Sequence, residues 1–423
     1  MKVLRAATAT LALVVASALP LGSQARPAPD QNGRGTELTI SLVTMGPGTE
    51  VWERFGHNAI RVHDSVRHTD LQYNYGLFDF RQEKFYTRFA QGRMLYSMGG
   101  FDAVRDMARY AAENRSVWVQ ELNLTPAQRA DLRDFLEWNA LPEHRDYHYD
   151  YYRDNCSTRV RDAIDRVIGG RIRAATDTVP TGTTFRSHTA RLTSAEPLVY
   201  TGLMIGLGAP VDRPISAYEE TFLPLALREQ VRGISLPGAD GMPVPLVRSE
   251  RTVYLSTTPD PPAEPPRWAP VYLAIGLVVG GLLVLLGRGA AAASPGAAAG
   301  LAVAGGLWGL ISGLLGTILA GLWAFTDHVA AYANENLFQL DPLALGLAVL
   351  VPAAVLSARS NGRRAMALSA ATLAVALLGL TFKLWPGRHQ VNDIVLALAL
   401  PIHLGLWLAL RTIHRARAAR AIA

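Results

Sequence analysis

The chain has 423 residues, of which 49% are hydrophobic and 18% are charged, and its formal net charge is +6. This composition excludes an intrinsically disordered chain, a collagen-like protein and a small disulfide scaffold. The averages conceal a change near residue 268, because 60 of the 243 residues in 26–268 are charged, against 14 of the 155 in 269–423. We therefore expect a water-exposed domain followed by a membrane domain.

The first 25 residues have the pattern of a secretory signal. Two basic residues precede an apolar run of 14 residues (6–19), and residues 23–25 offer a small-residue cleavage site. The run is shorter than the roughly 18–20 residues that span a bilayer, and a retained first transmembrane helix is the alternative. We expect residues 1–25 to be a signal peptide and residues 26–258 to form an exported catalytic domain.

The C-terminal part of the chain follows a proline-rich linker at 259–268 and carries long apolar runs. Arginines cluster after the first, third and fifth runs, whereas the formal charges of the loop 326–341 are all acidic. By the positive-inside rule, the N-terminal domain is periplasmic and the C-terminus cytoplasmic, in a bacterial inner (cytoplasmic) membrane. The arginine-rich tail is then a topology determinant, and no nucleic-acid partner is expected. The expected membrane domain, 269–423, has about five spans, at 269–286, 300–325, 342–357, 365–384 and 391–410.

The exported domain mixes strand and helix patterns without a regular alternation of the two. Strand patterns occur at 38–42, 55–62, 71–77 and 117–124. Thr125, with Pro126 and Gln128 after it, gives the N-terminal signature of a helix. These elements predict an α+β domain.

The single cysteine of the chain stands where a helix is expected to begin. From Cys156 the apolar positions keep helical spacing as far as Ile168, and Asp154 or Asn155 is a suitable N-cap. Backbone N–H groups in a first helical turn favour a thiolate and offer an oxyanion hole. Cys156 is therefore a candidate nucleophile, and a cysteine that seats the helix in the core is the alternative.

A nucleophilic thiol needs a base, and His57 on a predicted strand is the candidate. The choice of a third residue stays open. The candidates for orienting the imidazole or lining the substrate site are His68, Asp70, Tyr75 and Asn155. No metal or cofactor is expected, because the histidines lie at no recognised ligand spacing and the lone cysteine offers no cysteine pair.

Three motifs around these residues are shared with a known family. They are Phe55-Gly56-His57, Tyr73-Asn74-Tyr75-Gly76 and Asp154-Asn155-Cys156-Ser157-Thr158, the last with Arg161-Asp162. The sequence here resembles the Lnb-type N-terminal periplasmic domain, whose bacterial members act as lipoprotein N-acyltransferases. The resemblance continues at 206–213 and 222–224, and in the membrane half at Asp327-His328 and 334–337.

The resemblance implies that Cys156 accepts an acyl group as nucleophile and that His57 is its general base and acid. It also suggests that the loop 326–341, with His328 and Asn334-Glu335-Asn336, completes the substrate cleft. A histidine ahead of an Asn-Cys helix is similar, in architecture alone, to the circularly permuted papain-like fold of lecithin:retinol acyltransferase-type enzymes and some murein peptidases.

The expected activity is therefore thiol-dependent acyl transfer. The donor would be a membrane phospholipid, and the acceptor the N-terminal amine of a diacylated lipoprotein, with an acyl-cysteine thioester between them. Two other classes stay open. One is a periplasmic papain-like murein peptidase or amidase, and the other is a non-catalytic membrane sensor or scaffold.

Overall fold

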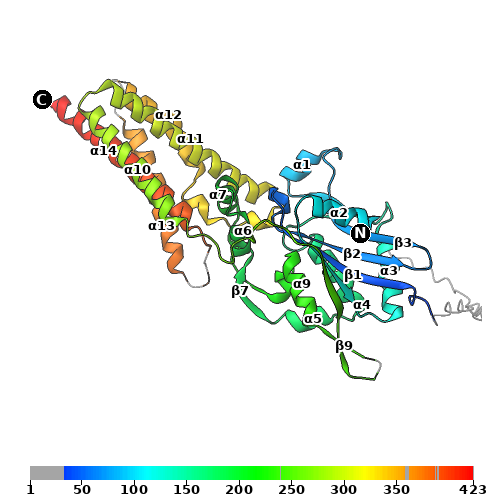
Figure 1. Ribbon diagram of the computed structural model, residues 1–423. Helices are drawn as coiled ribbons and strands as arrows, with labels where there is room; N and C mark the ends of the chain where they lie inside the picture. Colours follow the sequence, from blue (N-terminus) through cyan, green and yellow to red (C-terminus); the bar gives the residue numbers. More distant parts are fainter. Residues whose placement is uncertain (1–32, 239, 358–361, 386, 388–389, 423) are drawn as a thin grey trace, which may run out of the picture.

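The computed structural model describes residues 33–238, 240–357, 362–385, 387 and 390–422. The predicted signal peptide, 1–25, lies outside these residues. The described chain forms a sheet-containing N-terminal domain and an elongated helical bundle that extends from it (Figure 1). The α+β prediction for the first domain is confirmed, and so is the expectation of about five apolar helices in the second.

The N-terminal domain is built on one antiparallel sheet with strand order β11-β5-β1-β2-β3-β4-β6. The strands are β1 Leu38–Met45, β2 His57–Asp64, β3 Thr69–Leu77, β4 Leu95–Asp102, β5 Val117–Leu122, β6 Asp146–His148 and β11 Val247–Tyr254. Two small sheets pair β7 Pro180–Thr184 with β8 Pro214–Ser216 and β9 Ser235–Pro237 with β10 Pro243–Pro245. The helices are α1 Phe85–Ala90, α2 Ala103–Ala112, α3 Pro126–Asn139, α4 Cys156–Val167, α5 Arg171–Thr176, α6 Phe185–Thr193, α7 Pro197–Gly206, α8 Ala217–Glu220 and α9 Pro224–Arg232.

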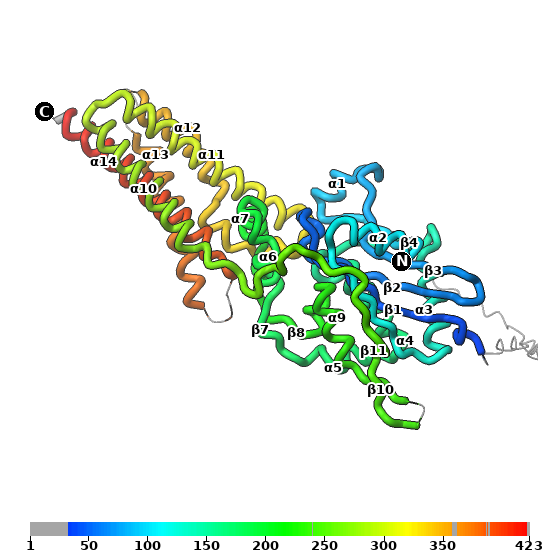
Figure 2. Tube along the Cα trace, in the orientation of Figure 1, coloured from blue at the N-terminus to red at the C-terminus, as the bar shows by residue number. Residues whose placement is uncertain are grey.

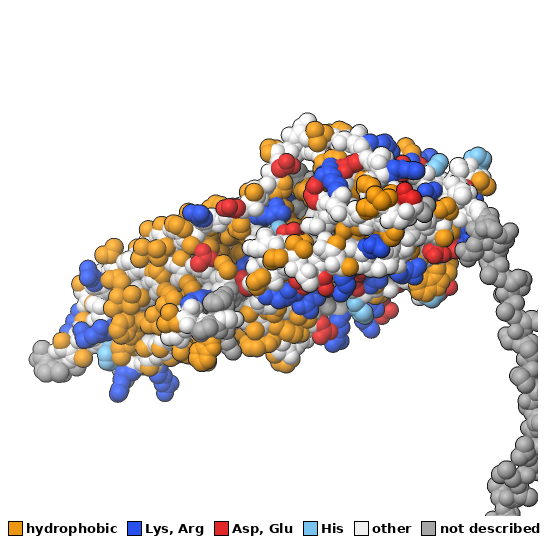
Figure 3. Space-filling model, turned by 90° about the horizontal axis from the view of Figure 1, so that it is seen from below, with side chains coloured by type: hydrophobic (Ala, Val, Ile, Leu, Met, Phe, Trp, Pro, Cys, Tyr) orange, Lys and Arg blue, Asp and Glu red, His pale blue; other side chains and the backbone are white. Residues whose placement is uncertain are grey.

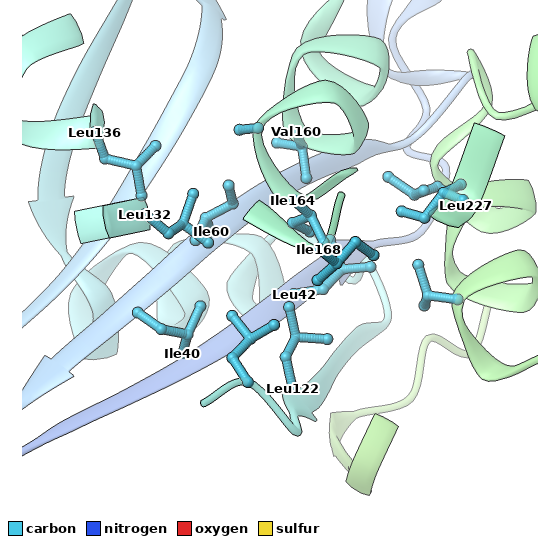
Figure 4. Close-up of a cluster of buried hydrophobic side chains, with 14 of the residues drawn as sticks. Ile40, Leu42, Ile60, Leu122, Leu132, Leu136, Val160, Ile164, Ile168 and Leu227 are labelled. Carbon is cyan, nitrogen blue, oxygen red and sulfur yellow. The ribbon is translucent and has the colours of Figure 1, made fainter. Parts of the chain in front are cut away.

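Both faces of the sheet are covered by helices. Since successive side chains along a strand point to opposite faces, each strand contributes to a core on either side. On one face, strand residues such as Leu42 and Ile60 pack against Val160 and Ile164 of α4, with α3 and α9 beside them (Figure 4). On the other face, a smaller cluster that includes Ala59 packs against α2. Loops join the strands at the two ends of this helix–sheet–helix arrangement.

The C-terminal half contains, among the described residues, five helices that are long and apolar enough to cross a membrane. They are formed by α10 Ala269–Ala291, α11 Pro295–Phe325, α12 Leu345–Leu356 with the short turns before it, α13 Arg363–Thr381 and α14 Asp393–Ile422. The glycines of α11 allow neighbouring segments to approach closely: a Cβ at Gly313 would lie 2.3 Å from the backbone nitrogen of Leu345. Hydrophobic side chains cover this half, whereas most charged side chains gather over the sheet domain (Figure 3).

Helix α7 attaches the sheet domain to the bundle. Its buried residues Tyr200 and Met204 belong to the same core cluster as Leu319 of α11 and Ile394 of α14. The chain trace shows α6 and α7 against the near end of the bundle, with the α10 helix starting beside them (Figure 2). The two halves are therefore packed together, and the ten-residue linker 259–268 is not their only connection.

Candidate active site

Cys156 is the first residue of α4, as the sequence predicts, and Asn155 is the N-cap. The Asn155 side chain accepts hydrogen bonds from the backbone N–H groups of Ser157 (2.9 Å) and Thr158 (3.0 Å). Thr158 Oγ1 accepts in turn from the Asn155 backbone N–H (2.8 Å), which completes a capping box. Asn155 Nδ2 donates to the Phe222 carbonyl (2.9 Å), so this side chain fixes the position of the helix start.

The thiol is partly buried at the end of the β2–β3 ladder. Backbone N–H groups of Asn58 and Ser157 stabilise its anion, which places the sulfur beside the strand residue that follows His57. Gly76 makes room for it, because a Cβ at this position would lie 3.4 Å from Cys156 Cβ and the backbone φ is +85°. Tyr149 also lies near the thiol, within 3.9 Å of the same hypothetical Cβ.

His57 is the first residue of β2, and its ring is held by Asn74 of β3. His57 Nε2 lies 2.9 Å from Asn74 Oδ1. The Asn74 amide nitrogen donates to Asp106 Oδ2 (2.9 Å) and to the Gln72 carbonyl (3.3 Å), which fixes the oxygen toward the imidazole. His57 Nε2 therefore carries the proton, and Nδ1 keeps a free lone pair. The ring also stacks on Tyr110 of α2, with the ring centroids 5.9 Å apart.

The two candidate groups reach the same end of β2 from different faces of the sheet. The His57 ring lies on the face covered by α2, whereas α4 packs on the opposite face. Cys156 stands at the tip of α4, where the β2 backbone at Asn58 contacts the thiol. Both groups therefore lie near the start of β2, on different faces of the sheet.

Burial keeps both groups uncharged at neutral pH. It raises the pKa of the Cys156 thiol to about 11, although the nearby backbone N–H groups and Arg115 act in the opposite direction. Burial also lowers the pKa of His57 to about 4, although the hydrogen bond that its ring donates to Asn74 acts in the opposite direction. The first-turn N–H groups favour the thiolate, as the sequence predicts, but desolvation outweighs them and the thiol is the resting form.

The other residues proposed from the sequence to orient His57 lie elsewhere. His68 is exposed in the turn between β2 and β3, at the far end of the hairpin. Asp70 pairs with Arg61 through two contacts of 2.7 and 2.5 Å. Tyr75 OH donates to Asn139 Oδ1 (2.8 Å). Asn74 takes the orienting position, and the strand register between β2 and β3 was the signal that would have identified it.

The outer loop 326–341 contacts the sheet domain through α1 and α7. His328 Nε2 donates to the Phe89 carbonyl (2.9 Å) at α1. Asn334 Nδ2 donates to the carbonyls of Ile205 and Gly206, and Asn336 Nδ2 to that of Ile205 (2.9 Å), at the C-terminus of α7. The asparagines thus satisfy helix-end carbonyls rather than line a cleft beside the thiol. Within the described ranges, no group of three or more His, Cys, Asp or Glu side chains is arranged to hold a metal ion.

Two family models match the chain. The Lnb N-terminal periplasmic domain matches residues 26–191, which include the cysteine and histidine described above, and the Lnb transmembrane domain matches residues 277–415. The chain belongs to the Lnb-type family. It is accordingly a membrane protein with a periplasmic N-terminal domain and five apolar helices. No similar curated protein and no similar solved structure was found.

Proposed function

We propose that this protein is a lipoprotein N-acyltransferase that uses Cys156 as nucleophile and His57 as general base and acid. The proposal is supported by a helix-tip thiol and an imidazole, its Nε2–H fixed by Asn74, that both lie near the start of β2. The membership of both halves of the chain in the Lnb-type family supports a role in lipoprotein maturation.

In the first half-reaction, Cys156 Sγ attacks the ester carbonyl of a membrane phospholipid, and His57 Nδ1 takes the thiol proton. Because both groups rest uncharged, the proton moves as the C–S bond forms, and not beforehand. The backbone N–H groups of Asn58 and Ser157 stabilise the charge that develops on oxygen. His57 then protonates the departing lysophospholipid alkoxide, which leaves an acyl thioester on Cys156.

In the second half-reaction, the α-amine of a diacylglyceryl-cysteine attacks the thioester carbonyl. His57 Nδ1 accepts the amine proton and returns it to the sulfur as the C–S bond breaks, so that an amide and the free thiol result. The thioester makes this step practicable, since a thiol is a better leaving group than an alkoxide. We also propose that the N-terminal domain has the circularly permuted papain-like arrangement, which the strand histidine and the helix-tip cysteine support.

The deciding experiment replaces Cys156 by Ala and by Ser in a strain that lacks its own lipoprotein N-acylation enzyme. We expect mass spectrometry of lipoprotein N-termini to show triacylated product with the wild-type protein and none with either variant, at equal membrane abundance. Undiminished triacylation in the Cys156→Ala strain would refute the mechanism. Peptidoglycan cleavage in zymograms, without lipoprotein acylation, would identify a murein hydrolase instead.

Asn74 has the role of a positioning residue in this mechanism. Replacing Asn74 by Ala removes the hydrogen bond that holds the imidazole, and we expect the acylation rate to fall about 100-fold. The same bond raises the pKa of His57, so its loss moves the acid limb of the pH–rate profile to still lower pH. A rate loss with an unmoved acid limb would mean that Asn74 only supports the fold.

The proposed topology places the C-terminus in the cytoplasm. Arginines of the α14 tail, of the α10 end and of the start of α13 lie at the end of the bundle that faces away from the sheet domain (Figure 3). This distribution fits the positive-inside rule when the sheet domain is periplasmic. We expect a reporter that works only in the cytoplasm to be active when it is fused after residue 423. Activity of a reporter that works only in the periplasm, at the same position, would contradict the assignment.

A further inference from the structure

A continuous series of aromatic rings connects the surroundings of the thiol with the outer loop of the membrane domain. The Tyr149 ring stacks on Tyr96 with centroids 4.2 Å apart, and Tyr96 lies 5.5 Å from Phe78. The series continues to Phe80, Phe85 and Phe89 with centroid distances of 5.0, 5.0 and 6.4 Å. We call this series the aromatic track; its members are Tyr149, Tyr96, Phe78, Phe80, Phe85 and Phe89.

One end of the aromatic track lies at the candidate nucleophile. Tyr149 and Cys156 both border the space that Gly76 leaves free, since a Cβ on Gly76 would meet Cys156 Cβ at 3.4 Å and Tyr149 Cε2 at 3.9 Å. Charge on Cys156 also contributes to raising the pKa of Tyr149. The track therefore begins within reach of an acyl group attached to the sulfur.

The other end of the aromatic track rests on the segment that follows the membrane-spanning helix α11. The Phe89 ring lies 6.3 Å from the His328 ring, and the Phe89 carbonyl accepts from His328 Nε2 at 2.9 Å. The Asp327 backbone N–H donates to the Gln91 carbonyl at 2.7 Å. Figure 1 shows α1 beside the end of α11 that faces the sheet domain. The track thus runs from the membrane boundary to the thiol.

The membrane end of the track exposes large apolar surfaces. Phe80 is 60% exposed, Phe89 49% and the neighbouring Tyr86 77%. Such exposure in one short segment marks a binding surface for an apolar partner. Residues 78–93 also carry four basic and two acidic side chains, and Arg93 pairs with Asp327 of the outer loop. The remaining excess of one positive charge suits the phosphates of lipid headgroups.

We propose that the aromatic track binds the fatty acyl chain of an outer-leaflet phospholipid and guides it to Cys156. The inference rests on the proposed acyltransferase function and adds the site of the donor chain. A lipid chain is the occupant because the track begins at the end of a membrane span and lies beside net positive charge. Its members also offer aromatic ring faces, which suit an acyl chain better than they suit a peptide strand. The exposed rings of α1 contact the bilayer, and the inner rings Tyr96 and Tyr149 line the path to the sulfur.

The test compares a long-chain donor with a short one on the same protein. The Phe80→Ala/Phe89→Ala double variant is purified in full length and placed in phosphatidylethanolamine–phosphatidylglycerol vesicles. We expect Cys156 acylation by the vesicle lipids to fall about tenfold or more, because two ring contacts with the chain are lost. Acylation of Cys156 by water-soluble p-nitrophenyl butyrate should stay within about twofold of the wild-type rate, since this ester needs no chain site.

Trp138→Ala is the matched control, because Trp138 is also an exposed aromatic residue but lies on α3, outside the track. Equal loss with both donors in the double variant, or an equal long-chain loss in the Trp138→Ala protein, would overturn the proposed track. Retention of long-chain acylation in the double variant would overturn it too, while leaving the acyltransferase function intact. In Cys156→Ser, we expect acylation of the protein by both donors to be lost. Acylation that persists there would overturn the proposed function itself.

A second readout needs no activity. Cys156→Ala protein in the same vesicles is exposed to light with a phosphatidylethanolamine that carries a diazirine in its acyl chain. We expect cross-linked peptides from residues 78–96 in addition to those from the membrane helices. Labelling confined to the membrane helices would show that no acyl chain reaches the aromatic track.

Discussion

The sheet domain touches the membrane domain at two junctions of opposite character. At the α7 junction, an apolar helix packs its buried residues Tyr200 and Met204 against α10, α11 and α14, and its terminal carbonyls are bonded by buried amides. At the α1 junction, exposed aromatic rings and an exposed Arg93–Asp327 ion pair meet the loop after α11. The difference predicts that α7 is the permanent attachment and that the α1 contact is the weaker of the two.

The largest expected effect concerns the thiol of Cys156. Burial keeps its pKa at about 11 rather than the usual 9, so iodoacetamide should label the folded protein slowly at pH 7. The labelling rate should rise about tenfold per pH unit until the pH approaches 11, as the thiolate fraction grows. A rate that levels off near pH 9 would show that the thiol is hydrated.

The next largest effect is expected at the α7 junction, from Arg186. This side chain and its partner Asp212 are only 2% and 4% exposed, and Arg186 also donates to the carbonyls of Leu207 and Gly208. Replacing Arg186 by Met leaves the Asp212 carboxylate buried without its partner, at a cost of about 3–5 kcal/mol. Thermal unfolding of the purified protein in detergent measures it.

The control for this variant is Arg213→Met, which breaks an exposed pair with Glu219 and should scarcely move the unfolding midpoint. Equal midpoints for the Arg186 and Arg213 variants would contradict the view of α7 as the permanent attachment.

An intermediate effect is expected from Asn336. Its amide nitrogen donates to the carbonyls of Met204 and Ile205, and Asn336→Ala removes both of these buried hydrogen bonds. We expect a loss of about 1–3 kcal/mol in the free energy of unfolding. Asn123→Ala, which removes an exposed bond to the Pro245 carbonyl, is the comparison variant and should lose much less.

The smallest effect is expected from Arg93, because its ion pair with Asp327 is exposed to solvent. Arg93→Ala should leave the unfolding midpoint unchanged within the error of a thermal scan. If the variant instead unfolds as early as Arg186→Met does, the two junctions are not different in strength.

Local signals in the sequence predicted the elements that carry the candidate site. The Asn155 cap, the helical spacing after Cys156 and the strand around His57 are all read from neighbouring residues, and each is present in the structure. Strands β4 and β11 were not predicted, because the glycines of β4 and the charged residues of β11 obscure the alternation that marks a strand.

Features that depend on the folded surroundings were not accessible in this way. Asn74 becomes the partner of His57 only through the β2–β3 register, which pairs Ala59 with Asn74. Desolvation of Cys156 depends on what covers it, so the direction of its pKa shift could not be read from the capping pattern. The packing of α7 against membrane helices was likewise not predicted, since its ten residues are too few to span a bilayer.

The length of α11 sets the height at which the chemistry would occur. With 31 residues the helix is about 46 Å long, whereas the hydrocarbon layer of a bilayer is about 30 Å thick. A helix with that surplus must tilt or project beyond the hydrocarbon, and the contact of His328 with α1 follows directly after its outer end. Under the proposed function, a donor lipid would then meet the sheet domain without leaving its leaflet.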